Sequence, residues 1–391
     1  MIEINEGKIN SFCLKKQHLT DDSKINDIVK ITKDIGGLHA TSSATTYLSL
    51  FVRTNKFQRD YLNKELYVKR NLGKVRYVRG TIYVLPKDKI PFAYSAIRSY
   101  IYPLSCKYAE YHGISDGDYR RISKQILKAL DRKAMTAKEI KKAAGIKSKI
   151  SQILNLMCDD GQLIRAKPKG EWKSNLHTYC RMDQYFPGLE LFTLDESEAK
   201  KQVILQYINS FGPVTLNDIT WWTKFHKTKI RAILPDIEDE IIQVKVTENN
   251  EPHYILTTQK KALQSTRVKK KPMVNLLPTL DTYIMGYKDR ERYIDLEYYD
   301  YVFDRSGNGV SSIFIDGKIH GVWDFAEKPE PIVKLFYFKD VKKVHEKQIQ
   351  SKAKNIGKFI AGCEVGIRKC KHMAPLSKRT AGGFMSPLKD C

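Results

Sequence analysis

Two side chains that could act on a water molecule stand two residues apart near the start of the chain. His39 and Thr41 flank Ala40 in the segment 36–43, G-G-L-H-A-T-S-S. In extended backbone, residues two apart point the same way, so we expect the imidazole and the hydroxyl to share one space. A neutral imidazole can orient or deprotonate a water, and the hydroxyl can supply a second hydrogen bond. The structural alternatives are a helix C-cap or a buried position for His39, and N-capping for Thr41.

The residues around this pair predict the start of a helix. Gly36 and Gly37 stop a preceding helix, and Ser42, Ser43 and Thr45 are N-cap types ahead of an apolar run. The N–H groups and positive dipole end of a helix N-terminus attract phosphate. Ser42 and Ser43 are therefore candidate contacts to a phosphate backbone.

The charge of the chain indicates the class of its partner. The chain of 391 residues contains 68 Lys and Arg and 44 Asp and Glu, which gives a net charge of +24. A protein with such a large positive charge is expected to bind nucleic acid. An anionic membrane is disfavoured, because no apolar run approaches the ~20 residues of a spanning helix and no signal pattern stands at the N-terminus. A basic surface that only keeps the protein soluble is the remaining alternative.

The cysteines indicate a reduced intracellular compartment. There are seven, an odd number, and none forms a C-x-x-C pair, so we expect no disulfide framework. Cys363 and Cys370 near His372 lack the spacing of a zinc finger. We therefore expect no metal and no cofactor, and a cytoplasmic, nucleoid-associated location.

One order of elements recurs three times in the first 268 residues, and it is the order of a winged helix: helix, short helix, helix, basic hairpin. The clearest copy begins with a helix over 118–132. A short second helix starts at the capping box of Thr136 and Glu139, and a third helix covers 148–158. Two strands follow, over 162–166 and 176–182. Another copy has helices from 197 to 211, from Thr215 to 222 and over 226–234, then strands over 241–246 and 253–257. The first copy has helices over 23–35, 45–53 and 59–72 and a hairpin over 74–85.

The first hairpin combines cations with aromatic rings. Arg76 and Arg79 stand beside Tyr77 and Tyr83, with Gly80 at the turn. This pairing suits a nucleic-acid backbone, and a solvated hairpin face is the alternative.

The composition changes after the basic run at 269–271, which we interpret as a linker. Glycine turns then separate strand-like segments, and the tail after Cys363 is rich in Lys, Arg, Gly and Ser and is expected to be mobile. The predicted strands cover 292–303, 311–315, 318–323 and 332–338, and a helix covers 341–360. They predict an antiparallel sheet or small barrel.

The predicted fold class is therefore α+β, with tandem winged-helix (helix-turn-helix) domains followed by a C-terminal antiparallel β-barrel-like domain. The expected domains are a first winged helix with the His39 loop, two further winged helices, and the barrel-like domain with its basic tail, over residues 1–115, 116–190, 191–268 and 269–391.

Nearly the whole chain resembles a known family, the winged-helix DNA glycosylases of the AlkZ/YcaQ type. The resemblance rests on G-G-L-H-A-T-S, on E-L-Y-V-K-R and K-V-R-Y-V-R-G-T-I-Y-V-L-P, and on D-T-Y-I-M-G-Y-K-D-R and D-G-K-I-H-G-V-W. It implies three tandem winged helices with a basic, concave face for duplex DNA, a C-terminal β-barrel, excision of alkylated bases and unhooking of interstrand crosslinks.

The family's catalytic motif implies a role for His39 and Thr41. That motif is a polar pair around one apolar residue: two glutamines, glutamine with aspartate, or histidine with glutamine. His39 has a precedent there, whereas Thr41 departs from these pairs. Asp281 begins the segment D-T-Y-I-M-G-Y-K-D-R, which also resembles the family, and it is a second candidate whose carboxylate could stabilise a sugar cation.

Further basic side chains are predicted to position the DNA without reading its sequence. They are Lys147, Lys149, Lys227, Lys229, Arg231 and Arg290, the last with a surface pairing to Asp289 as its alternative.

Two functions are consistent with these residues. The first is a monomeric glycosylase for N7- or N3-alkyl purines in damaged duplex DNA. The second is a non-catalytic DNA-binding protein such as a transcriptional regulator. The many unlike wings and the lack of a dimerisation heptad or ligand domain favour repair.

Overall fold

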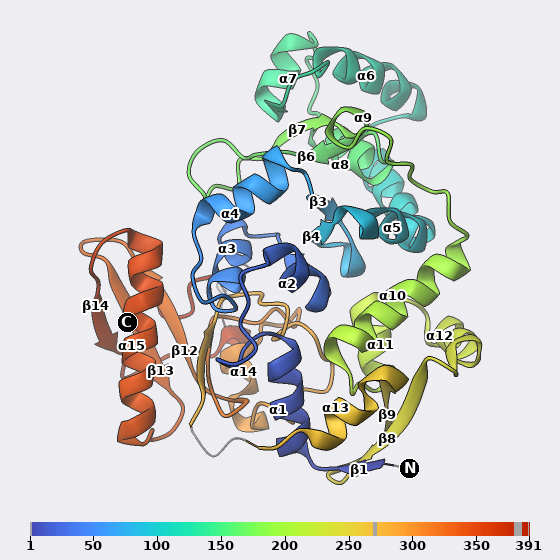
Figure 1. Ribbon diagram of the computed structural model, residues 1–391. Helices are drawn as coiled ribbons and strands as arrows, with labels where there is room; N and C mark the ends of the chain where they lie inside the picture. The colour runs from blue at the N-terminus through green and yellow to red at the C-terminus, as the bar shows by residue number, and fades with distance from the viewer. Residues whose placement is uncertain (1, 269–271, 379–384, 390) are drawn as a thin grey trace. The chain divides into compact units, whose positions relative to one another are not determined.

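The structure is a computed structural model that describes residues 2–268, 272–378, 385–389 and 391 (Figure 1). The chain forms two compact units, each assembled from separated stretches. The terminal unit contains Met1–Asp27, Leu48–Phe57 and Tyr207–Cys391, and the inner unit contains Ile28–Tyr47 and Gln58–Gln206. The predicted linker at 269–271 lies outside the described residues, and the boundaries of four domains stay a prediction.

Two sets of elements with the same order make up most of the inner unit. The first set is α2 (Ile28–Asp34), β2 (Leu38–His39), α3 (Ser43–Phe51, which runs on into the terminal unit), α4 (Arg59–Asn63) with the π-helix η1 (Lys64–Val68), β3 (Leu72–Arg76) and β4 (Ile82–Pro86). The second set is α6 (Asp116–Ala129), β5 (Met135–Thr136), α7 (Ala137–Ala143), α8 (Ser151–Asp159), β6 (Leu163–Arg165) and β7 (Thr178–Arg181). Both sets have the order of helices and hairpin that the sequence predicts.

The strands of the two sets share one six-stranded sheet, in the order β2-β4-β3-β6-β7-β5. In each set the short strand after the first helix pairs with the last strand of the hairpin, β2 with β4 and β5 with β7. The hairpins meet where Lys74 on β3 pairs with Arg165 on β6. His39 is therefore fixed at one edge of a continuous sheet.

Apolar spacing explains the helices of the second set. Ile122 and Ile126 on α6 and Leu154 on α8 lie in one buried cluster, as their i, i+4 spacing requires. Thr136 opens α7 through the predicted capping box with Glu139. The predictions did not include α5 (Ile90–Tyr111), whose buried face has the same helical spacing, or the short α9 (Met182–Tyr185).

A third set with this order lies mainly in the terminal unit. It comprises α10 (Glu196–Phe211, which starts in the inner unit), α11 (Leu216–Thr223), α12 (Lys227–Ile233), the 3₁₀ turn η4 (Leu234–Ile237), β8 (Ile241–Val246) and β9 (Asn249–Leu256). Val214, just before α11, forms a bridge to Tyr254 on β9, so the strand connection of the other sets recurs. The sequence did not reveal β1 (Ile2–Ile4), which pairs in parallel with β8, α1 (Glu6–Lys16) or α13 (Lys260–Ser265).

The C-terminal sheet is open and mixed, so the predicted antiparallel barrel is not what the described residues form. Its order is β10-β11-β12-β13-β14, and β13 and β14 run parallel. These strands are β10 (Val274–Leu277), β11 (Ser312–Ile315), β12 (Lys318–Ala326), β13 (Ile332–Tyr337) and β14 (Gly366–Lys369), and α15 (Lys343–Ala361) connects the last two. A helix crossover allows a parallel neighbour, whereas the predicted hairpins would have given antiparallel pairs only.

The strand predicted over 292–303 is wrong. The segment forms a 3₁₀ turn, η6 (Leu296–Tyr298), and the helix α14 (Tyr299–Val302). The rings of Tyr299 and Phe303 lie 4.9 Å apart, a contact that helical i, i+4 spacing produces. Aromatic residues are frequent in strands, but those of this segment are packed in another conformation.

The tail after Cys363 is more ordered than predicted where the structure describes it. β14 extends the sheet, and Leu376 and Leu388 are buried. Cys370 and Cys391 form a disulfide, which corrects the prediction of a chain without one and removes Cys370 as a metal ligand. Residues 379–384 of the predicted basic tail lie outside the described residues. Within the described chain, no helix has both the length and the apolar content to cross a membrane.

Candidate active site and nucleic-acid interface

The two glycines place the His39 strand against its neighbour. Gly36 and Gly37 have φ of 76° and 101°, and they end α2. A Cβ on Gly37 would lie 2.7 Å from Cδ2 of Leu85 on β4, closer than a side chain tolerates. Only glycine allows this approach, which lets β2 pair with β4 so that His39 faces Tyr83 across the strands.

His39 is buried beside aromatic rings. It is only 3% exposed, and its ring centroid lies 5.2 Å from that of Tyr83. Tyr83 contacts Tyr77 edge to face, and burial raises the pKa of Tyr83 to about 12, so its hydroxyl stays protonated at neutral pH. Of the alternatives for His39, the buried position is the one observed. The two tyrosines are themselves buried, so they are not the stacking platform that the sequence suggested.

Thr41 has the opposite environment. Within the described stretch 35–50 it is the only exposed residue. The N–H of Ala40 donates to the carbonyl of Ile82 at 2.7 Å, which extends the pairing by one residue before the chain bends at Thr41. A hydroxyl at the surface thus follows a buried imidazole, and their predicted common direction stays a prediction.

Comparison of the three sets shows that this loop is an addition to the repeated pattern. In the other two sets Thr136 is the last residue of the short strand β5 and Thr215 directly follows the bridge at Val214, and each caps the next helix through a capping box. In the first set Ala40, Thr41 and Ser42 stand between β2 and α3. The insertion brings an exposed hydroxyl to the point where the other sets simply begin a helix.

A residue from the second hairpin occupies the start of α3. The N–H of Ser43 donates to Oδ1 of Asn175 at 2.9 Å. Ser42 and Ser43 are 7% and 1% exposed, which leaves little of either for the predicted phosphate contact. In place of phosphate, an amide side chain from the loop between β6 and β7 accepts this hydrogen bond.

The same loop is anchored by a tryptophan. Trp172 contacts Tyr47 on α3 edge to face at 5.4 Å, and the guanidinium of Arg59 lies 4.5 Å from its ring centroid. The predictions missed Trp172 and Asn175. A tryptophan within a polar, basic turn was the available signal, because such a large ring is seldom left in solvent.

Asp281 has a different role from the predicted one. It is fully buried, and its two oxygens accept hydrogen bonds from Nη2 and Nη1 of Arg53, both at 2.7 Å. The hydroxyl of Ser49 also donates to it at 2.7 Å. The carboxylate therefore holds the second half of α3 and is not presented to a sugar cation.

Arg290 is likewise unsuited to the predicted phosphate contact. It is 4% exposed and lies 3.7 Å above the ring of Phe303. Its guanidinium donates to the hydroxyl of Tyr299 and to the carbonyl of Gly307. The alternative surface pairing with Asp289 is not observed either.

The first hairpin does not present a pair of free arginines. Nη1 of Arg76 donates to Asp159 at 2.8 Å and to Ser105 at 3.0 Å, so this side chain links β3 to α8 and α5. Arg79 is half-buried and has a positive φ of 58° at the turn beside Gly80. The predicted turn is confirmed, but Arg76 serves the packing of the unit.

The other predicted cations are exposed. Lys147 and Lys149 precede α8, and Lys227, Lys229 and Arg231 lie on α12, each in the third helix region of its set. Lys227 also donates to Asn217 at 3.1 Å. Their exposure is compatible with phosphate contacts, which stay a prediction.

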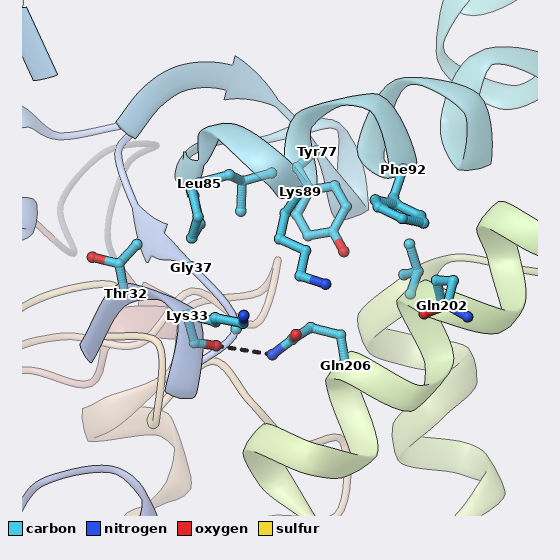
Figure 2. A pocket seen from close by; sticks show the side chains of 12 residues that line it. Thr32, Lys33, Gly37, Tyr77, Leu85, Lys89, Phe92, Gln202 and Gln206 are labelled. Carbon is cyan, nitrogen blue, oxygen red and sulfur yellow. Dashed lines mark hydrogen bonds between the residues drawn. The ribbon is translucent and has the colours of Figure 1, made fainter. Parts of the chain in front are cut away.

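A small cavity lies beside the glycine pair. Figure 2 shows the amide of Gln206 donating to the carbonyl of Lys33 at 2.9 Å across this cavity, near Gly37 and Tyr77. Its volume is about 20 Å³, enough for one water molecule. It is too small for a nucleobase.

Comparisons with known proteins agree with this architecture. A Streptomyces sahachiroi protein named interstrand DNA cross-link repair glycosylase is 20% identical over 347 residues, which cover 85% of this chain and 90% of that protein. The solved structure of the Streptomyces sahachiroi DNA glycosylase AlkZ matches with a TM-score of 0.76 at 18% identity, over 94% of this chain and all of that one. The model of the family DNA glycosylase AlkZ-like matches residues 32–333, more than three quarters of the chain. The chain therefore belongs to the AlkZ-like DNA glycosylase family.

Proposed function

We propose that the protein is a monomeric DNA repair glycosylase that hydrolyses the N-glycosidic bond of N7- or N3-alkylated purines in duplex DNA. The observation that carries the proposal is the family match over residues 32–333, which includes the His39 loop. The name of the Streptomyces relative, a cross-link repair glycosylase, extends the proposal to the unhooking of interstrand crosslinks. We also propose that the three repeated sets are winged helices, and that the protein acts in the cytoplasm at the nucleoid.

The proposed reaction requires little from the protein. The alkylated purine carries a positive charge and leaves as a neutral base, while water adds to C1′ of the sugar and loses a proton. The target nucleotide must first leave the base stack. General-base assistance of about 10²- to 10⁴-fold suffices for such a leaving group and is too small for a normal base.

In this proposal Thr41, in the loop, and His39, at the end of β2, have separate roles. The exposed hydroxyl of Thr41 contacts the nucleotide or its attacking water. His39, behind it, orients that water or takes its proton, after a small movement of the loop gives its imidazole access. The loop is a place where the first set departs from the other two, and loops that a rigid scaffold positions often carry catalytic residues.

The test is excision from a duplex with a single N7-methylguanine. Heat or alkali after incubation cleaves the strand wherever a base has been released. We expect cleavage at the modified position and none in the unmodified duplex or in one that contains uracil. A second substrate, with an interstrand crosslink between N7-alkylated purines, tests unhooking by release of single strands.

Two observations favour the second function, a DNA-binding protein without catalysis. His39 is 3% exposed, and Thr41 stands where the family has glutamine or aspartate. Salt-dependent binding to the same duplexes without release of any alkylated base would support this function and contradict the first.

A further inference from the structure

A second cavity in the inner unit is lined by four cationic side chains. Its volume is about 420 Å³, within the usual range of ligand sites. The cations come from the chain after η1, from the turn after α6 and from the start of the second hairpin loop: Arg70, Arg132, Lys133 and Lys167. The cavity is distinct from the His39 loop, none of whose residues line it.

Among the described residues, no acidic side chain lines this cavity. Arg132, Lys133 and Lys167 are exposed and make no ion pair with a described residue, although many other cations of the chain do. Asp131 stands near the rim, where its carboxylate accepts a hydrogen bond from Gln184 at 2.7 Å. Such a concentration of positive charge is costly unless an anion completes it.

The backbone around the cavity is unusual in three places. Arg70 and Arg132 have φ of 56° and 52°, a conformation that non-glycine residues rarely adopt. The π-helix η1 ends two residues before Arg70, and single π turns often mark functional sites. Strained conformations of this kind persist where the structure fixes side chains for a ligand.

A hydrogen-bond donor accompanies the charge. Tyr67, on η1, is one of the residues that line the cavity. Its hydroxyl is buried and has no hydrogen-bond partner among the described residues. Burial raises the pKa of Tyr67, so the hydroxyl keeps its proton and can donate. The guanidinium of Arg70 is held in place by the carbonyls of Gln184 and Tyr185.

We propose that this cavity binds a phosphodiester of the DNA backbone and so fixes the register of the duplex on the inner unit. The four cations that line the cavity select an anion, and the guanidinium of Arg70 suits one with several oxygens. This proposal depends on the proposed function in one respect, that the protein binds DNA. It does not depend on the release of a base.

The first experiment measures affinity for an undamaged duplex as a function of salt. The variant K133Q/K167Q removes two cations of the cavity, and K124Q/K128Q removes the same charge from α6, away from it. One lost phosphate contact lowers the slope of log K against log salt by about 0.9. We expect that loss for the cavity variant and an unchanged slope for the control. Equal losses in both variants would overturn the proposal.

The second experiment locates the contact. Single methylphosphonates, which lack the charge, are scanned along one strand. For the wild type and for K124Q/K128Q, a methylphosphonate at one particular backbone position should weaken binding. At that position the same methylphosphonate should not weaken binding of K133Q/K167Q, because the contact is already lost. An identical profile for all variants would contradict a phosphodiester in the cavity.

A free phosphate is the other source of the same chemistry. Inorganic phosphate or thymidine monophosphate, added at constant ionic strength, should not displace the duplex at millimolar concentration. Micromolar binding of either, lost in K133Q/K167Q, would make this a small-anion site and overturn the proposal. Excision of N7-methylguanine is measured separately, so a protein without glycosylase activity can still confirm the binding site.

Discussion

In the proposed mechanism, His39 and Thr41 contribute different properties to the activation of a water molecule. The imidazole has a fixed, buried position against Tyr83, and the hydroxyl is exposed at the bend that follows. A buried base keeps its orientation and is shielded from bulk water, whereas the exposed residue can meet the substrate. Their separate contributions can be measured, because either side chain can be shortened without removing a strand partner.

Replacement of His39 by Ala should lower single-turnover excision by about 10²-fold with DNA binding retained, as loss of a general base does. Thr41→Ala should cost less, and Thr41→Gln should raise the rate if the family's usual pair is the better catalyst. The measurement is the rate of strand cleavage at saturating protein. An unchanged rate for His39→Ala would remove His39 from the mechanism.

Asp281→Ala should destabilise the protein by about 3–5 kcal/mol, because it leaves the buried guanidinium of Arg53 without its partner. Asp340, an exposed carboxylate, provides the control, and its replacement by Ala should change the free energy of unfolding by less than about 0.5 kcal/mol. Urea denaturation measures both. A stable Asp281→Ala variant that has lost excision would restore Asp281 as a catalytic residue.

At the scale of elements, the second hairpin loop and α3 depend on each other. Asn175→Ala removes the acceptor for the Ser43 N–H and should cost about 0.5–2 kcal/mol, the usual value of an N-cap. Asn175→Asp keeps the acceptor and adds a negative charge at the helix N-terminus, so it should be at least as stable as the wild type. Equal destabilisation in both variants would show that the amide acts through another contact.

The same loop should respond to acid through His177. Burial, then the positive charges of Lys74 and Arg165, lower the pKa of His177 from 6.5 to about 4. Between pH 4 and pH 6.5, His177 is therefore protonated in the unfolded chain and neutral in the folded chain. Stability from this residue is complete above pH 6.5 and is lost as the pH falls toward 4.

Replacement of His177 by Gln should flatten the fall in stability between pH 6.5 and 4. Urea midpoints of the wild type and the variant at several pH values measure the difference, which separates this residue from the carboxylates that titrate in the same range. Parallel curves for the two proteins would show that His177 does not contribute.

The elements also show where sequence patterns suffice and where they do not. Helical spacing predicted α6, a capping box predicted α7 and the N-cap residue Thr215 predicted α11, because these signals are local. The burial of His39 depends on the close approach of β4, and the partner of Ser43 lies 132 residues away. The partner of Asp281, Arg53, lies 228 residues away, which no local pattern reveals. Arg290 is buried against nearer residues, Tyr299, Phe303 and Gly307, in a segment that was predicted as a strand and is not one.

At the scale of the whole molecule, the net charge of +24 should dominate binding to DNA. The exposed lysines of the two third-helix regions, Lys147 and Lys149 in one set and Lys227 and Lys229 in another, provide matched pairs of variants. Each pair changed to Gln should weaken binding to damaged and undamaged duplexes by the same factor, since phosphate contacts carry no base information.

The salt dependence completes this prediction. Log K should fall by about 0.9 per phosphate contact for each decade of salt, and each double variant should lower that slope by up to two contacts. Fluorescence anisotropy from low to moderate salt measures it, and sedimentation of the complex checks that one protein binds per site. Affinity that hardly changes with salt would contradict a phosphate interface. A marked preference for one palindromic sequence, bound by two copies, would instead identify the protein as a regulator, because half-site recognition requires a dimer.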